Sequence, residues 1–550
     1  MENWYADNGD GTYTNPILYT DYSDPDAIRV GDDFFMTASS FCNTPGLPIL
    51  HSKDLVNWEI IGYGLQNIPY ESYALPRHGC GVWAPAIRYY NGEFVIFFPM
   101  PDEGIFMIKT KDPWGDWSEP VPVFEGAGWI DPCPFIDDDG KAYMVNAFAR
   151  SRIGFKSVLQ IVELSDDLTR IIGEPVRVFD GNINGNETIE GPKLYKRNGW
   201  YYIFAPAGGV KQGWQTVLRS RNIYGSYEFR NVMEQKDTPV NGPHQGAWVD
   251  TPAGEDWFIH FQDVYAAGRI VHLQPLRWAD DWPVIGKALP GEICGKPVGT
   301  WSKPKVRGTD PADKEGDNNS EGAMGQTIFA PDTSDDFDGE LLGLQWQWNA
   351  NYRREWIRTD SKNSSVILNS IPAEASISDQ PNLLLQKWPM PEFRAVTKLN
   401  ISGLKEGDET GIVNMGVRYA ALSVYFENGK FGLRKISGEQ VFNGEIASAK
   451  DEVKCVVQDL KACGLGTDIW FKYSVTSVTS IENDSTGKYI FPIPREIVTL
   501  SYSLDGHNFI PVLDFEAKAG RWVGVKCGMY IRYTFGKEGG EVSSDYFVFE

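Results

Sequence analysis

The sequence lacks long apolar runs. No stretch approaches the roughly 18 consecutive apolar residues of a membrane-spanning helix. Residues 1–5 contain neither the basic nor the apolar segment that begins a secretory signal peptide. We therefore expect a cytoplasmic protein without a membrane partner.

Cysteine and histidine are scarce and scattered. The seven cysteines include no Cys-x-x-Cys pair, so we expect reduced thiols rather than a disulfide framework. The six histidines include no His-Glu-x-x-His motif, so the sequence offers few candidate ligands for a zinc site.

Basic residues are outnumbered by acidic ones. The chain has 51 Lys and Arg against 74 Asp and Glu, a formal net charge of -23. A strongly acidic surface repels nucleic acid and anionic lipid, whereas the binding of a neutral ligand does not depend on this charge. We expect no nucleic-acid partner.

Long helical periodicity is also scarce, whereas turn and strand residues are abundant. The 550 residues include 56 Gly and 34 Pro, and 13% are aromatic, a composition typical of many short strands joined by turns. Since single cores rarely exceed about 250 to 300 residues, we expect two large domains. The predicted class is all-β.

One pattern recurs along the first 300 residues. A carboxylate or Trp beside a proline precedes a short strand, a Gly-containing turn and a second strand. The turn glycines lie 61, 48, 59 and 55 residues apart. The five copies are Asp24-Pro25 before Gly31, Trp83-Ala84-Pro85 before Gly92, Asp131-Pro132 before Gly140, Glu190-Gly191-Pro192 before Gly199 and, more loosely, His244 before Gly254.

This period predicts a five-bladed β-propeller over residues 1–300. About 50 to 60 residues with four short strands make one blade, and the blades close radially. A stack of β-sandwiches is the alternative, but sandwich strands do not repeat their turn chemistry in register.

Propeller geometry brings the starts of the five inner strands to one end of the axis. Asp24, Asp131 and Glu190 would meet there, near Trp83. Each carboxylate could instead cap a turn, and Trp83 could pack between blades rather than offer a face to a sugar. Three carboxylates beside a Trp in one channel mouth favour an active site.

Paired carboxyl groups suit glycoside hydrolysis. One must be protonated for the leaving oxygen and one ionised for the water or the sugar. A free Glu with a pKa of about 4.3 is only about 2% protonated near pH 6. A neighbouring carboxylate would keep such an acid protonated, so three carboxylates divide into base, acid and a group that tunes the acid.

These blocks resemble glycoside hydrolase family 43. Residues 15–18, Asp24-Pro25-Asp26, Trp83-Ala84-Pro85, Asp131-Pro132 and Glu190-Gly191-Pro192 occur in the order of the family's signature blocks, and residues 51–55 extend the match. The resemblance covers roughly residues 15 to 300. It implies hydrolysis with inversion, which requires about 6.5 to 9.5 Å between the acid and the base.

The resemblance also implies roles for single residues. Asp24 would be the general base, Glu190 the general acid, and Asp131 the residue that raises the pKa of the acid. Phe41 and Trp83 match aromatic walls of the sugar pocket, and Arg269 matches an arginine that contacts the sugar.

His244 resembles a channel histidine that sits by a calcium ion in many family members. A hydrogen-bonded core histidine is the alternative, and the surrounding residues 242–246 depart from the commoner Gly-His pattern. The resemblance thus implies no required cofactor and leaves a structural Ca²⁺ in the channel open.

Residues 301–335 are polar and aperiodic, as expected of a linker. Residues 336–550 alternate strands and turns without an in-register repeat, which predicts a β-sandwich. The block resembles the jelly-roll, concanavalin-like C-terminal domain of β-xylosidase-type members. It could bind carbohydrate independently, but we favour a lid that narrows the propeller mouth.

The sequence therefore predicts an exo-acting, inverting glycosidase. Its partner would be a small oligosaccharide, from which it would release terminal β-D-xylose or α-L-arabinofuranose. The alternatives are an arabinan-directed hydrolase of the same family, a glycan-binding propeller without catalysis and a retaining fructan hydrolase. Fructan hydrolases have an Arg-Asp-Pro block and a Glu-Cys acid, whereas this chain has Ile130-Asp131-Pro132 and Glu190-Gly191. Self-association into a homo-oligomer stays open.

Overall fold

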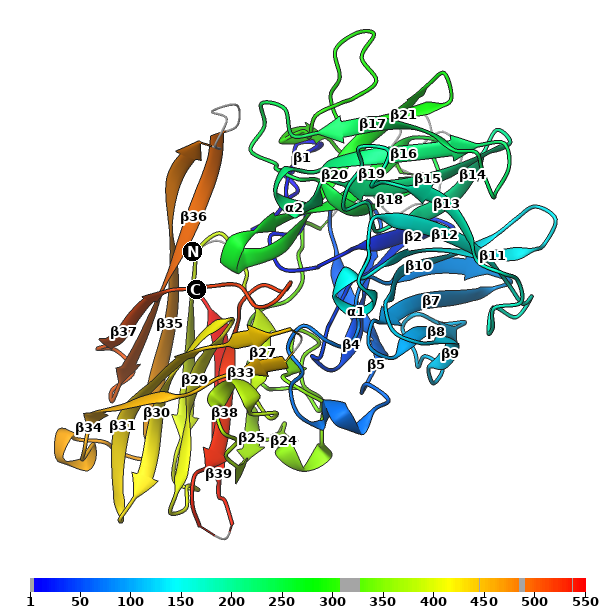
Figure 1. The fold of residues 1–550 in the computed structure, drawn as a ribbon. Helices are drawn as coiled ribbons and strands as arrows, with labels where there is room; N and C mark the ends of the chain where they lie inside the picture. Colours follow the sequence, from blue (N-terminus) through cyan, green and yellow to red (C-terminus); the bar gives the residue numbers. More distant parts are fainter. Residues whose placement is uncertain (1–3, 307–326, 445, 484–489, 537) are drawn as a thin grey trace, which may run out of the picture.

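The computed structural model describes residues 4–306, 327–444, 446–483, 490–536 and 538–550. Figure 1 shows two domains side by side, a propeller formed by the first half of the chain and a sandwich of long strands formed by the second. The predicted all-β architecture is confirmed.

Five antiparallel sheets of four strands form the propeller, so the predicted five blades are confirmed. In each blade the strands pair in sequence order, as the repeated turn chemistry requires. The blades are β2–β5 (Asp26–Val30, Asp33–Thr37, Gly46–Ser52, Glu59–Leu65), β6–β9 (Ala86–Tyr90, Glu93–Met100, Gly104–Thr110, Val121–Glu125), β10–β13 (Trp129–Ile136, Ala142–Phe148, Val158–Leu164, Val176–Asp180), β14–β17 (Lys193–Arg197, Trp200–Ala207, Trp214–Ser220, Glu228–Glu234) and β18–β21 (His244–Asp250, Asp256–Val264, Gly268–Ala279, Trp282–Ile285).

The first strand of each blade lies next to the axis. Strand β2 contacts β18 and β6, and β10 contacts β6 and β14. Apolar side chains fill the spaces between blades, as in the cluster of Phe34, Trp58, Trp257 and Leu273 between the first and fifth blades. The starts of the inner strands therefore surround one channel.

The two ends of the propeller are joined to each other. Strand β1 (Thr12–Thr14) pairs with β22 (Thr300–Ser302). The Asn15 side chain donates to the carbonyls of Leu273 and Val298 and accepts the Leu273 N–H, at 2.8 to 2.9 Å. This segment closes the ring of blades.

Helices are short and few among the described residues. They are α1 (Arg150–Ile153), α2 (Gly209–Gln212) and the single 3₁₀ turns η1 (Glu71–Ala74), η2 (Tyr265–Ala267), η4 (Arg354–Trp356), η5 (Ile377–Asp379) and η6 (Lys461–Cys463). None of the helices in the described part of the chain is long and apolar enough to cross a membrane.

Two sheets, antiparallel except where β26 pairs with β38, and a small hairpin form the sandwich, and the predicted concanavalin-like fold is confirmed. Trp356, Phe393, Phe471 and Met529 belong to the core between the sheets. The first sheet orders β23 (Gln347–Trp348), β27 (Leu384–Lys387), β38 (Lys526–Tyr533), β29 (Asp408–Met415), β30 (Arg418–Glu427), β31 (Lys430–Glu439) and β34 (Glu452–Val457), with β26 (Ile371–Pro372) beside β38; the second orders β24 (Ile357–Asp360), β25 (Ser365–Asn369), β39 (Glu541–Phe549), β28 (Phe393–Asn400), β35 (Asp468–Asn483), β36 (Ile490–Ser503) and β37 (Ile510–Glu516); the hairpin is β32 (Val441–Asn443) and β33 (Ile446–Ser448).

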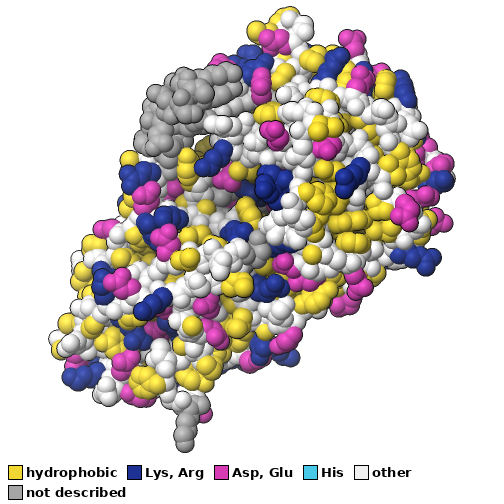
Figure 2. Space-filling view, viewed as in Figure 1, with side chains coloured by type: hydrophobic (Ala, Val, Ile, Leu, Met, Phe, Trp, Pro, Cys, Tyr) yellow, Lys and Arg dark blue, Asp and Glu magenta, His cyan; other side chains and the backbone are white. Residues whose placement is uncertain are grey.

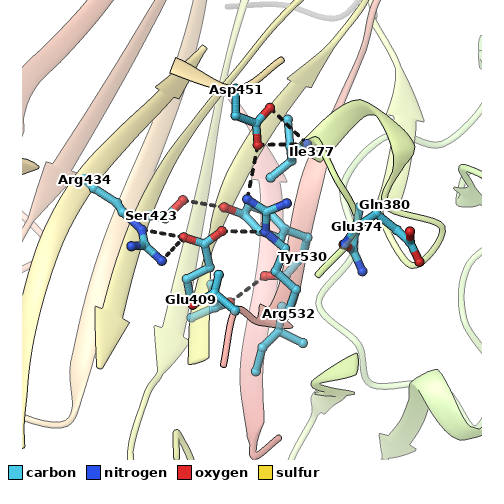
Figure 3. A network of polar contacts seen from close by, with 12 residues as sticks. Glu374, Ile377, Gln380, Glu409, Ser423, Arg434, Asp451, Tyr530 and Arg532 are labelled. Carbon is cyan, nitrogen blue, oxygen red and sulfur yellow. Dashed lines mark hydrogen bonds and ion pairs between the residues drawn. The ribbon is translucent and has the colours of Figure 1, made fainter. Parts of the chain in front are cut away.

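A buried ion network links the first sheet to the segment around η5 (Figure 3). Glu409 is fully buried between Arg434 and Arg532 and accepts a hydrogen bond from each. Arg532 also contacts Asp451, whose carboxylate accepts the Ile377 N–H. Since each buried charge has an opposite partner, this network fixes the segment over the sheet rather than leaving an uncompensated charge.

The domains share backbone pairing as well as side-chain contacts. The N–H groups of Thr44 and Trp348 each donate to the other's carbonyl. The Val525 N–H donates to the Ala266 carbonyl, and Gly524 approaches Gly268 so closely that a Cβ on Gly268 would lie 2.5 Å from the Gly524 Cα. Glycine is therefore required at this contact.

Of the predicted linker, residues 307–326 lie outside the described residues. Its first residues follow the propeller, since Lys303 pairs with Asp7 and Asp54. After the gap, the Phe329 N–H donates to the Asn57 side chain. The linker thus contacts the propeller at Lys303 and Phe329 and reaches the sandwich at its end, where Asp335 pairs with Phe547 of β39 through two backbone hydrogen bonds.

Acidic and basic side chains are interspersed on the face shown in Figure 2. The acidic excess of the chain therefore does not form a single patch on this face.

Closure of the propeller can be tested at Asn15. Asn15→Ala removes two hydrogen bonds to Leu273 of the fifth blade and one to Val298 beyond it, and we expect the free energy of unfolding to fall by about 2 to 3 kcal/mol. Urea denaturation followed by tryptophan fluorescence measures this change. Asn363→Ala, which removes one exposed hydrogen bond to Asp360, is the matched control and should change stability little. Equal effects of the two substitutions would contradict the proposed closure.

Candidate active site

One pocket of about 380 Å³ contains every site residue that the sequence predicts. It lies where the inner strands begin, because its lining includes residues shortly before β2, β6 and β14 and residues near the start of β10 and β18. The predicted residues in it are Asp24, Phe41, Trp83, Asp131, Glu190, His244 and Arg269.

The carboxylates sit on unusual backbone. Asp24 and Asp131, each followed by proline, both have φ near +55°, and Gly191 after Glu190 has φ +59°. Asp131 also lies in a β-bulge, because the pairing of β10 with β11 shifts between Ile130 and Cys133. Left-handed backbone and bulges cluster at functional sites, where they re-aim side chains.

Asp24 is held by donors on both oxygens. The hydroxyls of Ser23 and Ser39 donate to Oδ2 at 2.8 and 2.6 Å, and Arg269 Nη1 donates to Oδ1 at 2.9 Å. Arg269 is 9% exposed and lies over the Phe261 ring. These donors fix the orientation of the Asp24 carboxylate and suit its ionised form.

Asp131 is buried beside Glu190. Burial and then the charge of Glu190 raise the pKa of Asp131, while the hydrogen bond from the Gly191 N–H, 2.7 Å long, opposes this. The Asp131–Glu190 pair therefore keeps one proton at a pH at which two isolated carboxyls would have lost both.

His244 contacts Glu190, one member of this pair. Its Nε2 lies 2.9 Å from Oε1 of Glu190, and the buried Nδ1 has no hydrogen-bond partner among the described residues. Calcium takes six to eight oxygen ligands, but the described residues contain no group of three His, Cys, Asp or Glu side chains that could hold a metal. Side chains of the described residues alone would therefore not complete a calcium ligand set beside His244, and a calcium ion there stays a prediction from the resemblance.

Three aromatic rings form a wall of the pocket. The Phe41 ring lies 6.3 Å from that of Trp83, and Trp522 meets Trp83 edge-on at 4.7 Å. Trp522 belongs to the sandwich, in the loop between β37 and β38. Its φ of +64° is rare for a bulky residue, and the loop is fixed to the propeller through Val525 and Gly524.

Sequence reasoning missed Trp522 and most of the rim. Lys156, whose Nζ donates to the Thr188 hydroxyl at 3.0 Å, lines the pocket together with Phe148 and Arg150. These residues lie outside the repeated blocks. Gln245 is an exception, because it lies in the fifth copy and also has a positive φ, +33°.

Comparisons with known proteins agree with this geometry. The family model described as "Glycosyl hydrolases family 43" matches residues 13–283, and "Beta xylosidase C-terminal Concanavalin A-like domain" matches residues 334–550. A protein of Xylanibacter ruminicola named putative beta-xylosidase is 38% identical over 531 residues, covering 95% of this chain and 87% of its own. A non-reducing end alpha-L-arabinofuranosidase of Bacteroides ovatus is 29% identical over 73% of both chains.

A solved family 43 structure from Bacillus licheniformis has the same two-domain fold. It superposes with a TM-score of 0.75 at 26% identity and covers 98% of this chain and 99% of its own. Its likeness extends over both domains. The propeller with its three carboxylates, the appended sandwich and these relatives show that the chain belongs to glycoside hydrolase family 43.

Proposed function

We propose that this protein is an exo-acting, inverting glycosidase that releases terminal β-D-xylose or α-L-arabinofuranose from xylan-derived oligosaccharides. One observation carries the proposal: Asp24, Asp131 and Glu190, from three different blades, line one pocket with aromatic walls. The names of the relatives support both sugars.

In this proposal Asp24 is the general base and Glu190 the general acid. Asp24 takes a proton from a water as the water oxygen attacks the anomeric carbon. Glu190 gives its proton to the leaving oxygen as the glycosidic bond breaks, and the attack from the opposite face inverts the anomeric centre. Solvent then restores both protonation states.

The neighbouring groups prepare these two carboxyls. Asp131 keeps one proton within its pair with Glu190, and His244 orients the Glu190 carboxyl through a 2.9 Å contact. Arg269 holds Asp24 from the side. No step depends on a metal, and calcium beside His244 stays a prediction from the resemblance.

The position of Trp522 supports exo action. A side chain from the second domain lines the pocket together with Trp83 and narrows it on that side. A pocket of about 380 Å³ suits one terminal sugar better than the middle of a long chain.

Replacement of the acid separates hydrolysis from binding. Glu190→Gln cannot give up a proton, and we expect kcat on p-nitrophenyl β-D-xyloside or xylobiose to fall at least about 10²- to 10⁴-fold, with xylose affinity nearly unchanged. Glu187→Gln, an exposed neighbour outside the pocket, should keep full activity. Unchanged hydrolysis by Glu190→Gln would support a different catalytic group.

Asp131→Asn should move the pH profile. Without the second carboxyl the remaining acid loses its proton at lower pH, so the alkaline limb of kcat/KM on xylobiose should move down by about one pH unit or more. Folding raises the pKa of Asp131. The contribution of this carboxyl to protein stability is therefore lost as the pH rises above the pKa that Asp131 has in the unfolded chain. The variant should therefore melt no lower than wild type at pH 7, and an unchanged pH profile would contradict the role of Asp131.

Trp522→Ala should open the pocket. We expect kcat/KM on xylobiose to fall about tenfold or more, because a buried aromatic contact of about 1.4 kcal/mol or more is lost. The inversion of the product, followed by proton magnetic resonance, should persist. Trp114→Ala, an exposed tryptophan outside this pocket, is the control. If Trp522→Ala lowers kcat/KM no more than the control does, the sandwich does not contribute to the active site.

A further inference from the structure

A second cavity, of about 290 Å³, lies between the two domains. It shares no lining residue with the active-site pocket. The propeller contributes Trp4, Tyr19 and Tyr22, and the end of β27 contributes Gln386 and Lys387. Its volume is just below the about 300 to 1,000 Å³ of small-molecule sites, which suits a ligand of monosaccharide size.

Gln386 is a polar group without a partner in this cavity. The residue is 2% exposed, and its Nε2 donates to nothing among the described residues. An unsatisfied buried donor costs about 1 to 3 kcal/mol. A ligand oxygen at this position would remove that cost.

Lys387 adds donor capacity beside it. Its Nζ donates to the Asp21 carbonyl at 2.6 Å and lies 3.8 Å from the centre of the Tyr22 ring. Among the described residues only one of its three donor positions therefore has a hydrogen-bond acceptor. Burial lowers the pKa of Lys387 to about 7. The amine thus carries less than a full charge near neutral pH, which favours a neutral ligand over an anionic one.

Aromatic rings complete the site. The Trp4 ring packs edge-on against Tyr19 at 5.3 Å, and the Trp4 indole N–H is already bonded to the Pro16 carbonyl. The rings therefore contribute mainly apolar surface. Apolar ring surface with a few fixed donors recognises a sugar, which has C–H faces and hydroxyl oxygens. We propose that the interdomain cavity is a second binding site for a neutral monosaccharide, separate from the catalytic pocket.

Fluorine resonances of the full-length protein labelled with 5-fluorotryptophan test this site. Trp4→Phe and Trp522→Phe identify the signals that report on the cavity and on the active site. During titration with D-xylose, L-arabinose and D-glucose, we expect the Trp4 signal to shift saturably with at least one sugar. Gln386→Met should weaken that response about tenfold or more and leave the Trp522 response unchanged. Gln458→Met, at an exposed glutamine outside the cavity, should leave both unchanged.

Three outcomes would overturn the proposal. In the first, the Trp4 signal does not respond to any of the sugars while the Trp522 signal does. In the second, the titration of Gln386→Met equals that of wild type. In the third, D-glucuronate shifts the Trp4 signal at a lower concentration than every neutral sugar. Folding of the variant is measured separately. Since the Gln386 Nε2 has no partner in the described part of the chain, the methionine variant should melt no lower than wild type. A loss of several degrees would show that the amide serves the structure instead.

Discussion

Repulsion among Asp24, Asp131 and Glu190 is the constraint that the surrounding structure must offset. Three ionised carboxylates in one partly desolvated pocket would be strongly unfavourable. Arg269 contacts Asp24 directly, and the charge of buried Lys193 lowers the pKa of Asp131. With one proton retained by the Asp131–Glu190 pair, the two remaining negative charges are balanced by these two cations. This balance is what the proposed roles of Asp24 as base and Glu190 as acid require.

The propeller can hold these groups together because each blade repeats the same local backbone. Asp24, Asp131 and Gly191 take left-handed φ values at nearly equivalent points, where the chain enters an inner strand. Such a conformation costs of order 1 to 3 kcal/mol at a non-glycine residue, and it persists because the blade on either side fixes the strand that follows. Strain and repulsion are thus both concentrated at the axis, and the packed blades around it supply the stability.

This repetition also explains what the sequence could predict. Asp24-Pro25 and Asp131-Pro132 are visible as copies of one block, and the number of blades follows from the spacing of the turns. Trp522 carries no such signal, since it lies in a non-repeating segment of the other domain and reaches Trp83 only through tertiary packing. Lys156 and Phe148 lie at the β11–β12 connection, where the blades differ in sequence. For His244 the resemblance left a calcium ion and a hydrogen-bonded histidine open; the structure shows the contact of its Nε2 with Glu190, and the ion stays a prediction.

The sandwich contributes directly to the pocket of the three carboxylates, because Trp522 lines it. Phe41 forms one aromatic wall, and three residues later Thr44 pairs with Trp348 of the sandwich through two backbone hydrogen bonds. Trp522 forms another wall, and three residues later Val525 donates to Ala266 of the propeller. Phe41 and Trp522 are therefore each positioned by a nearby backbone hydrogen-bond contact to the opposite domain. Because both contacts lie close to the rings that they position, a shift of one domain against the other would change the width of the pocket directly. The domain interface thus sets which part of a saccharide fits against the three carboxylates.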